Sequence, residues 1–156
     1  MKMNRKIKAE RYQVFDQDMV HDTHTMSCDF DDLTTDEAEE KYTVGFFFSY
    51  TGVIQASKDG VLGGIEITLP KLQADPPEFL RKPVALDAEI KEFMVRNNSD
   101  TRALFCFVDE GTVFWLQNAG PCAKAVDCGD IVFYLDEEAA MTGFLIKIKE
   151  KEWNAG

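Results

Sequence analysis

The chain has 156 residues, 45% of them hydrophobic and 12% aromatic, with 17 basic and 28 acidic side chains and a formal net charge of −11 at pH 7. The apolar content excludes a largely disordered chain, and the length predicts a single domain over 1–156 with a sizeable core. No apolar run approaches the roughly 20 residues that span a membrane, and none follows the charged N-terminus as in a signal sequence. We therefore expect a cytoplasmic protein without membrane contact, whose four cysteines are free thiols.

The negative charge is concentrated in one part of the chain. From Gln13 to Glu40 there are ten carboxylates and no lysine or arginine, whereas the first twelve residues carry five basic side chains against Glu10. A concentrated negative field favours the encounter with a basic partner. It also repels a phosphate backbone, so we expect no nucleic acid to bind through this acidic face.

Short apolar runs separated by turn residues follow the N-terminus. Thr34 and Glu37 stand in the capping-box arrangement, which predicts a short exposed helix from Thr35 to Lys41. The aromatic run "KYTVGFFFSY" follows, and Asp59-Gly60 is a hairpin turn signal. Gly63 and Gly64 in the next run predict a bulge or a close backbone approach.

Four of the five prolines lie in "PKLQADPPEFLRKP", residues 70–83, which excludes a regular strand there. The segment is either a linker between two half-domains or a long surface connection across one β domain. We favour the connection, because halves of about 70 residues would each have a small core. Its apolar residues Phe79 and Leu80 are expected to pack against the body of the protein, with contact to a partner as the alternative.

Residues 84–96 fit two patterns. Alternation of apolar and polar residues from Val84 to Ile90 indicates a strand, while Leu86, Ile90 and Phe93 fit one face of a helix. We favour the strand, followed by a hairpin loop at 97–100.

The rest of the chain repeats β-type runs with turn signals every 8–12 residues. This pattern predicts a mainly β fold, a sandwich or distorted barrel of about eight to ten strands with one or two short helices. Successive strand residues face opposite ways, so Phe46, Phe47 and Phe48 cannot all reach one core. Either both sheet faces are buried within the monomer, or a second subunit covers one of them, which makes a homo-oligomer an alternative.

Sequence motifs for catalysis are absent. There is no P-loop, no GxGxxG opening a helix, and no GxSxG, HExxH or CxxC, so we expect no cofactor. His21, His24 and Cys28 are ligand types suited to zinc, iron or manganese and form a candidate metal set. Their spacing matches no metal signature, and strand alternation would place the two histidines on opposite faces.

The interpretation that we favour is a non-enzymatic acidic interaction module, such as an inhibitor, an immunity-type protein or an adaptor. It would dock a basic surface of a partner protein through Asp29, Asp31, Asp32, Asp36, Glu37, Glu39 and Glu40. One alternative is a homo-oligomeric structural or assembly protein. Another is a small metal-dependent enzyme or small-molecule-binding β-barrel that uses His21 and His24.

Overall fold

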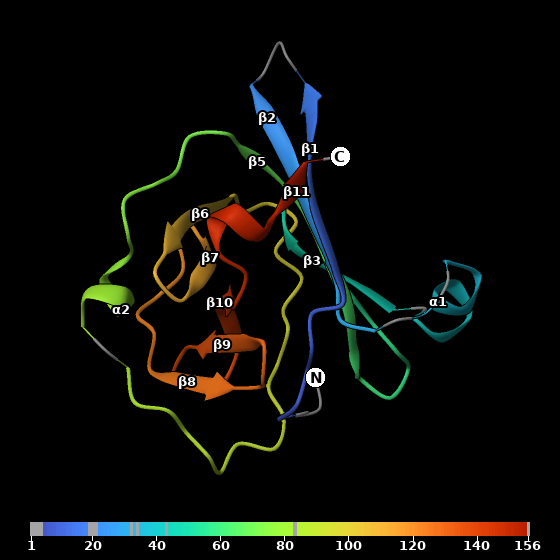
Figure 1. The fold of residues 1–156 in the computed structure, drawn as a ribbon. Helices are drawn as coiled ribbons and strands as arrows, with labels where there is room; N and C mark the ends of the chain where they lie inside the picture. Colours follow the sequence, from blue (N-terminus) through green and yellow to red (C-terminus); the bar gives the residue numbers. More distant parts are fainter. Residues whose placement is uncertain are drawn as a thin grey trace.

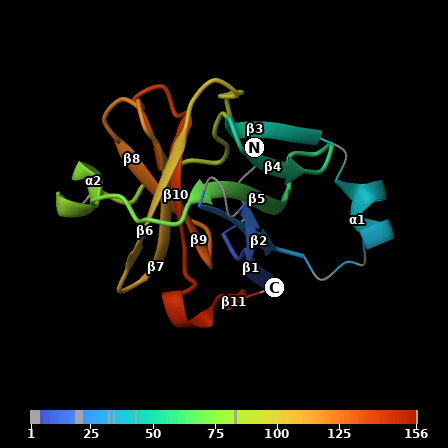
Figure 2. The same cartoon turned by 90° about the horizontal axis from the view of Figure 1, so that it is seen from above.

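The strands form two separate sheets that pack face to face (Figures 1 and 2). The computed structural model describes residues 5–18, 22–31, 33, 35–42, 44–82 and 84–155. The six-stranded sheet has the order β11-β1-β2-β5-β4-β3, and the five-stranded sheet the order β6-β7-β10-β9-β8. The strands are β1 (Arg11–Asp18), β2 (Thr23–Asp29), β3 (Val44–Ser49), β4 (Gly52–Ala56), β5 (Leu62–Pro70), β6 (Ala103–Val108), β7 (Gly111–Leu116), β8 (Lys124–Asp127), β9 (Ile131–Leu135), β10 (Met141–Ile146) and β11 (Asn154–Ala155).

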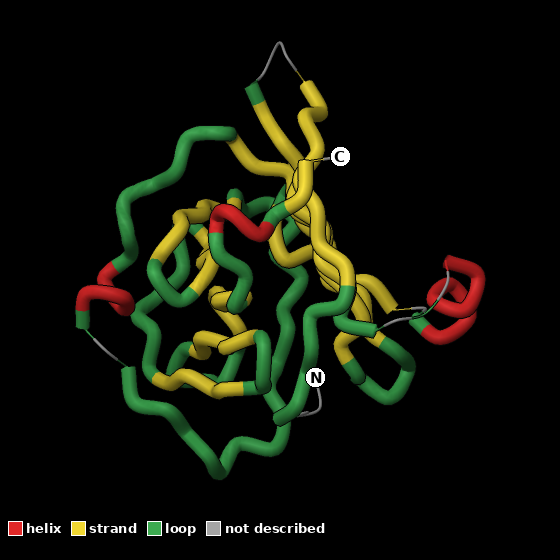
Figure 3. The backbone as a smooth tube through the Cα atoms, viewed as in Figure 1, coloured by secondary structure: helices red, strands yellow, loops and turns green. Residues whose placement is uncertain are grey.

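The prediction of a mainly β sandwich is confirmed, since the strands belong to two sheets rather than one sheet closed on itself. Two short helices, α1 (Thr35–Lys41) and α2 (Glu78–Arg81), and a 3-10 turn at Glu150–Glu152 complete the described elements (Figure 3). The first helix has the bounds expected from its acidic first turn. None of the described helices is long and apolar enough to cross a membrane.

The main hydrophobic core lies between the sheets. Strand alternation turns Met26 and Cys28 of β2 toward the five-stranded sheet, where both are fully covered. Phe144 of β10 stacks on Phe114 of β7 with ring centroids 5.1 Å apart, and it meets Phe48 of β3 edge-on at 5.0 Å. Each large apolar side chain buried in this way stabilises the fold by about 1.5–3 kcal/mol, so this layer holds the two sheets together.

The phenylalanine run of β3 divides between the two faces of its sheet. Phe48 is fully buried in the core and Phe46 packs half-buried against it, whereas Phe47 between them is 47% exposed. This is the alternation that a strand imposes.

The proline-rich connection covers the outer face of the five-stranded sheet. We call its residues 71–82, which include α2, the strap. Phe79 of α2 packs on Tyr134 of β9 with ring centroids 4.4 Å apart, and Leu80 joins the same outer apolar cluster. The prediction that Phe79 and Leu80 pack against the body is therefore confirmed. The five-stranded sheet is thus covered on both faces by one chain.

Residues 84–96 form neither the strand that we favoured nor the helix. The segment is extended and pairs through isolated bridges, Leu86 with Ala125 of β8 and Met94 with Ala140. The expected alternation of buried and exposed side chains is not kept, since Leu86 is 64% exposed while Asp87 is partly buried. Contact with the sheet is too intermittent to form a ladder. A turn follows, in which Thr101 N–H donates to Asn98 O at 3.0 Å. This turn leads into β6 but does not join two paired strands, so it is not a hairpin loop.

The basic N-terminal segment is docked from Arg5 onward. The Arg5 guanidinium donates to the backbone carbonyls of Ala88 at 2.9 Å and Ile90 at 2.8 Å. Ile7 is buried, and its N–H donates to Cys128 O at 2.9 Å. These contacts fix the extended segment 84–90 beside the turn that joins β8 and β9.

The C-terminal segment joins the two sheets at one end of the sandwich. β11 pairs with β1 in parallel. The indole Nε1–H of Trp153 donates to Thr112 Oγ1 at 2.9 Å, and Thr112 donates in turn to Ile148 O at 2.7 Å. Trp153 also meets the Tyr12 ring edge-on at 6.0 Å. The buried Trp153 is therefore satisfied as well as packed.

Candidate functional site

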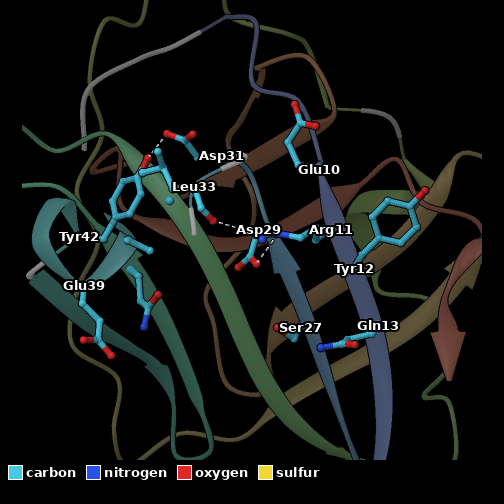
Figure 4. Close-up of a pocket in the computed structure, with 13 residues that line it drawn as sticks. Glu10, Arg11, Tyr12, Gln13, Ser27, Asp29, Asp31, Leu33, Glu39 and Tyr42 are labelled. Carbon is cyan, nitrogen blue, oxygen red and sulfur yellow. Dashed lines mark hydrogen bonds and ion pairs between the residues drawn. The ribbon is translucent and has the colours of Figure 1, made fainter. Parts of the chain in front are cut away.

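A polar groove lies on the outer face of the six-stranded sheet, beside α1 (Figure 4). The register places Arg11, Asp29, Gly64 and Gln55 side by side across β1, β2, β5 and β4. Because Gly64 has no side chain between Asp29 and Gln55, the sheet surface is hollow at this row. The groove has a volume of about 710 Å³ and is lined by Glu10, Arg11, Tyr12, Gln13, Ser27, Asp29, Asp31, Leu33, Ala38, Glu39, Tyr42, Gln55 and Gly63.

A β-bulge at Gly63 shapes one wall of the groove. Gln55 pairs with Gly64 and Ala56 pairs with Leu62, which leaves Gly63 as the extra residue of β5. A Cβ at Gly63 would lie 2.5–2.6 Å from three carbons of the Tyr42 ring. The glycine pair therefore provides both features that the sequence predicted, a bulge and a close approach, and the close approach seats Tyr42 on the strand.

Tyr42 and Lys41 hold Asp31 from the same side. The Tyr42 hydroxyl donates to Asp31 Oδ2 at 2.5 Å, and the Lys41 ammonium donates to the same oxygen at 2.9 Å. The hydrogen bond to Asp31 raises the pKa of Lys41, while burial, followed by that same carboxylate, raises the pKa of Tyr42. At neutral pH the lysine is charged and the phenol is protonated, so both remain donors to Asp31.

Asp29 is paired with Arg11 across the β1–β2 ladder. Arg11 Nε lies 3.5 Å from Asp29 Oδ2, and a terminal guanidinium nitrogen donates to Leu33 O. Partial burial raises the pKa of Asp29, and the nearby Arg11 charge opposes this shift. The Asp29 side chain is still 46% exposed, so the pair lies at the groove surface and not in the core.

Three of the acids predicted to bind a partner line the groove: Asp29, Asp31 and Glu39. Asp36, Glu37 and Glu40 lie exposed on α1 beside it, and Asp32 lies outside the described residues. The sequence interpretation missed Glu10, Arg11, Gln13, Ser27, Tyr42 and Gln55, which the sheet register brings to the same place. Alternation along β1 was the available signal, since it puts Arg11 and Gln13 on one face, but the pairing of β1 with β2 was needed to locate that face.

Two members of the candidate metal set, His24 and Cys28, lie on the inner face of β2. Cys28 lies four positions after His24 along β2, roughly 13 Å at 3.3 Å per residue, and Met26 lies between them. The His24 ring contacts Phe105 at 5.2 Å, and burial raises the pKa of the fully covered Cys28 thiol. Across the residues with described positions, no three His, Cys, Asp or Glu side chains are grouped to hold an ion. His21 lies outside those residues, so the set stays a prediction.

Compared with known proteins, the chain matches no family model, no curated protein and no solved structure. The residues of the groove are therefore the basis for assigning a function.

Proposed function

We propose that the protein is a non-enzymatic acidic interaction module whose groove and helix α1 dock a basic surface of a partner protein. The observation that carries the proposal is the charge around the groove. Its described lining contains the carboxylates of Glu10, Asp29, Asp31 and Glu39 and the cation of Arg11, and Lys41 beside the groove pairs with Asp31. The remaining exposed acids of α1 extend this negative surface beyond the rim.

The acids of the groove divide into two kinds. Asp29 and Asp31 are held by Arg11, Lys41 and Tyr42, which fixes their positions. Glu10 and Glu39 are exposed. The first kind shapes the groove, and the second supplies negative potential to an approaching partner.

A groove of this volume accepts protruding lysine or arginine side chains more readily than a flat surface does. An exposed ion pair contributes only about 0–1 kcal/mol, so several must act together for appreciable affinity. The same charges speed association, and salt screens them over about 8–10 Å at physiological ionic strength. We therefore expect an association rate that falls steeply as salt is added.

The test compares two triple variants that change the net charge of −11 by the same amount. One reverses Glu10, Glu39 and Glu40 to lysine at the groove and at the end of α1, where a basic residue also suits the helix dipole. The control reverses Asp109, Glu110 and Glu137, which are exposed on turns of the five-stranded sheet.

The probe is an immobilised short peptide rich in lysine and arginine, and the readout is its association rate at low and physiological ionic strength. The groove variant is expected to lose about tenfold or more in rate, and the control about twofold. Equal losses in the two variants would show that net charge alone drives binding, and the proposed docking site would be wrong.

The homo-oligomeric alternative is limited by the fold. Both faces of the five-stranded sheet are covered by the chain itself. Assembly would therefore use other exposed apolar residues, such as Phe47 of β3 on the outer face of the six-stranded sheet. Native mass measurements over a range of concentrations test this alternative directly.

A further inference from the structure

The outer face of the five-stranded sheet is apolar but has a thin cover. Cys106, Val113, Trp115, Tyr134 and Leu145 point away from the other sheet, yet each is at most 8% exposed. Their cover includes Ala74, Phe79 and Leu80 of the strap, with Val84 just beyond it. Every residue of the strap is itself partly or fully exposed. A single layer of chain therefore separates this face from water, and Figure 2 shows α2 on the side remote from the six-stranded sheet.

The strap is tied to the sheet near its start. Ala74 N–H donates to Phe105 O at 3.0 Å, and the Gln73 side chain accepts from Phe107 N–H at 2.8 Å. From residue 75 to residue 82, the backbone hydrogen bonds recorded for the described chain stay within the strap, from Leu80 to Pro77 and from Lys82 to Glu78. That part is held to the sheet by apolar contact, chiefly Phe79 on Tyr134.

A cavity beside α2 already opens part of this face to solvent. It has a volume of about 630 Å³, and its lining includes Phe79 of the strap, Trp115 of β7, and Val84 and Cys122 from the adjacent loops. Opening the strap would therefore enlarge an existing cavity and would not require two close-packed layers to separate. Pro76 and Pro77 restrict the backbone just before α2, so this part of the strap would move as one piece.

We propose that residues 71–82 form a cover that opens locally while both sheets stay folded, and that opening exposes the apolar outer face of the five-stranded sheet. Segments with few buried contacts and few hydrogen bonds to their surroundings open at lower free energy than the core of a domain. The core between the sheets has its own contacts and does not depend on the strap. The proposal is independent of the acidic groove, which lies on the other sheet.

The free cysteines provide the test, because they report on separate layers. Cys106 belongs to the outer cluster and follows Phe105, whose carbonyl accepts from Ala74 of the strap, whereas Cys28 and Cys128 lie in the core between the sheets. The protein is treated with a thiol-alkylating reagent under native conditions, and the modification of each cysteine is followed by peptide mass spectrometry. Local opening predicts that Cys106 reacts faster than Cys28 and Cys128.

Phe79→Ala weakens the main apolar contact of the strap and is expected to raise the Cys106 rate on the order of tenfold, with Cys106 still reacting faster than Cys28 and Cys128. Leu72→Ala is the matched control in the same strap, because Leu72 is 86% exposed. It should leave all three rates unchanged. Equal rates for the three cysteines in the unaltered protein would mean that the face opens only by global unfolding. An unchanged Cys106 rate in Phe79→Ala would mean that the strap does not control access to Cys106. Either result would overturn the proposal.

Hydrogen exchange in the unaltered protein gives a second readout that needs no substitution. The Phe107 N–H, bonded to Gln73 of the strap, is expected to exchange faster than the N–H of Phe114 in the centre of β7. Equal protection of the two amides would contradict local opening.

Discussion

Replacing Gly63 with alanine tests the wall of the acidic groove. The new methyl group would meet three carbons of the Tyr42 ring at 2.5–2.6 Å, well inside van der Waals contact. The ring must then move away from β5, which also stretches the bond from the Tyr42 hydroxyl to Asp31. Overpacking of this kind costs about 1–3 kcal/mol, and a lost hydrogen bond about 0.5–1.5 kcal/mol.

An opposing effect reduces this cost. Alanine restricts the unfolded chain more than glycine does, which stabilises the fold by about 0.4–1 kcal/mol when the native backbone accepts it. We expect Gly63→Ala to lower the free energy of unfolding by about 1–3 kcal/mol overall. In a Tyr42→Ala background the ring is absent, so the same substitution should be neutral or stabilising by up to about 1 kcal/mol.

Urea unfolding of the wild type, both single variants and the double variant completes a double-mutant cycle. The expected coupling energy between positions 63 and 42 is about 2 kcal/mol or more. A coupling below about 0.5 kcal/mol would mean that the two changes are additive. The close approach of Tyr42 to the bulge would then not be what makes glycine necessary, and this account of the groove wall would fail.

Two further predictions concern stability. Thr112→Val keeps the shape of a fully buried side chain but leaves Trp153 Nε1–H and Ile148 O without their partner. Urea unfolding should show that the free energy of unfolding falls by about 2–4 kcal/mol. Thr112→Ser keeps both hydrogen bonds and should lose clearly less stability. Burial raises the pKa of Asp136, but backbone N–H donors and Arg96 outweigh it and hold this pKa below its usual value. A carboxyl group whose pKa is lowered by folding stabilises the folded state at pH values above its pKa in the unfolded chain, about 3.9. This contribution is lost as the pH falls through the pKa of the group in the folded state. The Asp136→Asn variant should therefore be less stable than the wild type at pH 6. The difference between the urea midpoints of the two proteins, measured across pH, should narrow below about pH 4.

The fold class and α1 were predictable because each depends on neighbours in the sequence. Turn residues at regular spacing marked the strands, and the acids before Lys41 marked the helix. The glycine pair Gly63-Gly64 gave a correct local prediction for the same reason. The shape of residues 84–96 was not predictable, since partners far along the chain, Ala125 of β8 and Ala140 before β10, decide whether the segment pairs as a strand or only forms isolated bridges.

The groove was predictable only in part. Asp29, Asp31 and Glu39 stood out through the charge of their own segment. Glu10 belongs to the basic N-terminal run and Gln55 to a neutral one, so neither had a local signal. Their place in the groove follows from the order of β1, β2, β5 and β4 in the sheet, which composition and periodicity do not specify.

Each sheet is built almost entirely from one continuous half of the chain, with β1 to β5 before the strap and β6 to β10 after it. Because the main core lies between the sheets, the first half, β1 to β5, depends on the second to cover its inner face. During synthesis on a ribosome, the first half emerges with a complete apolar face and nothing to cover it. That face stays exposed until β6 to β10 arrive, and Trp153 and β11, which follow β10, then join the two sheets. The newly made chain is therefore most exposed to aggregation, and most in need of a chaperone, after β5 has been made and before β6 to β10 follow.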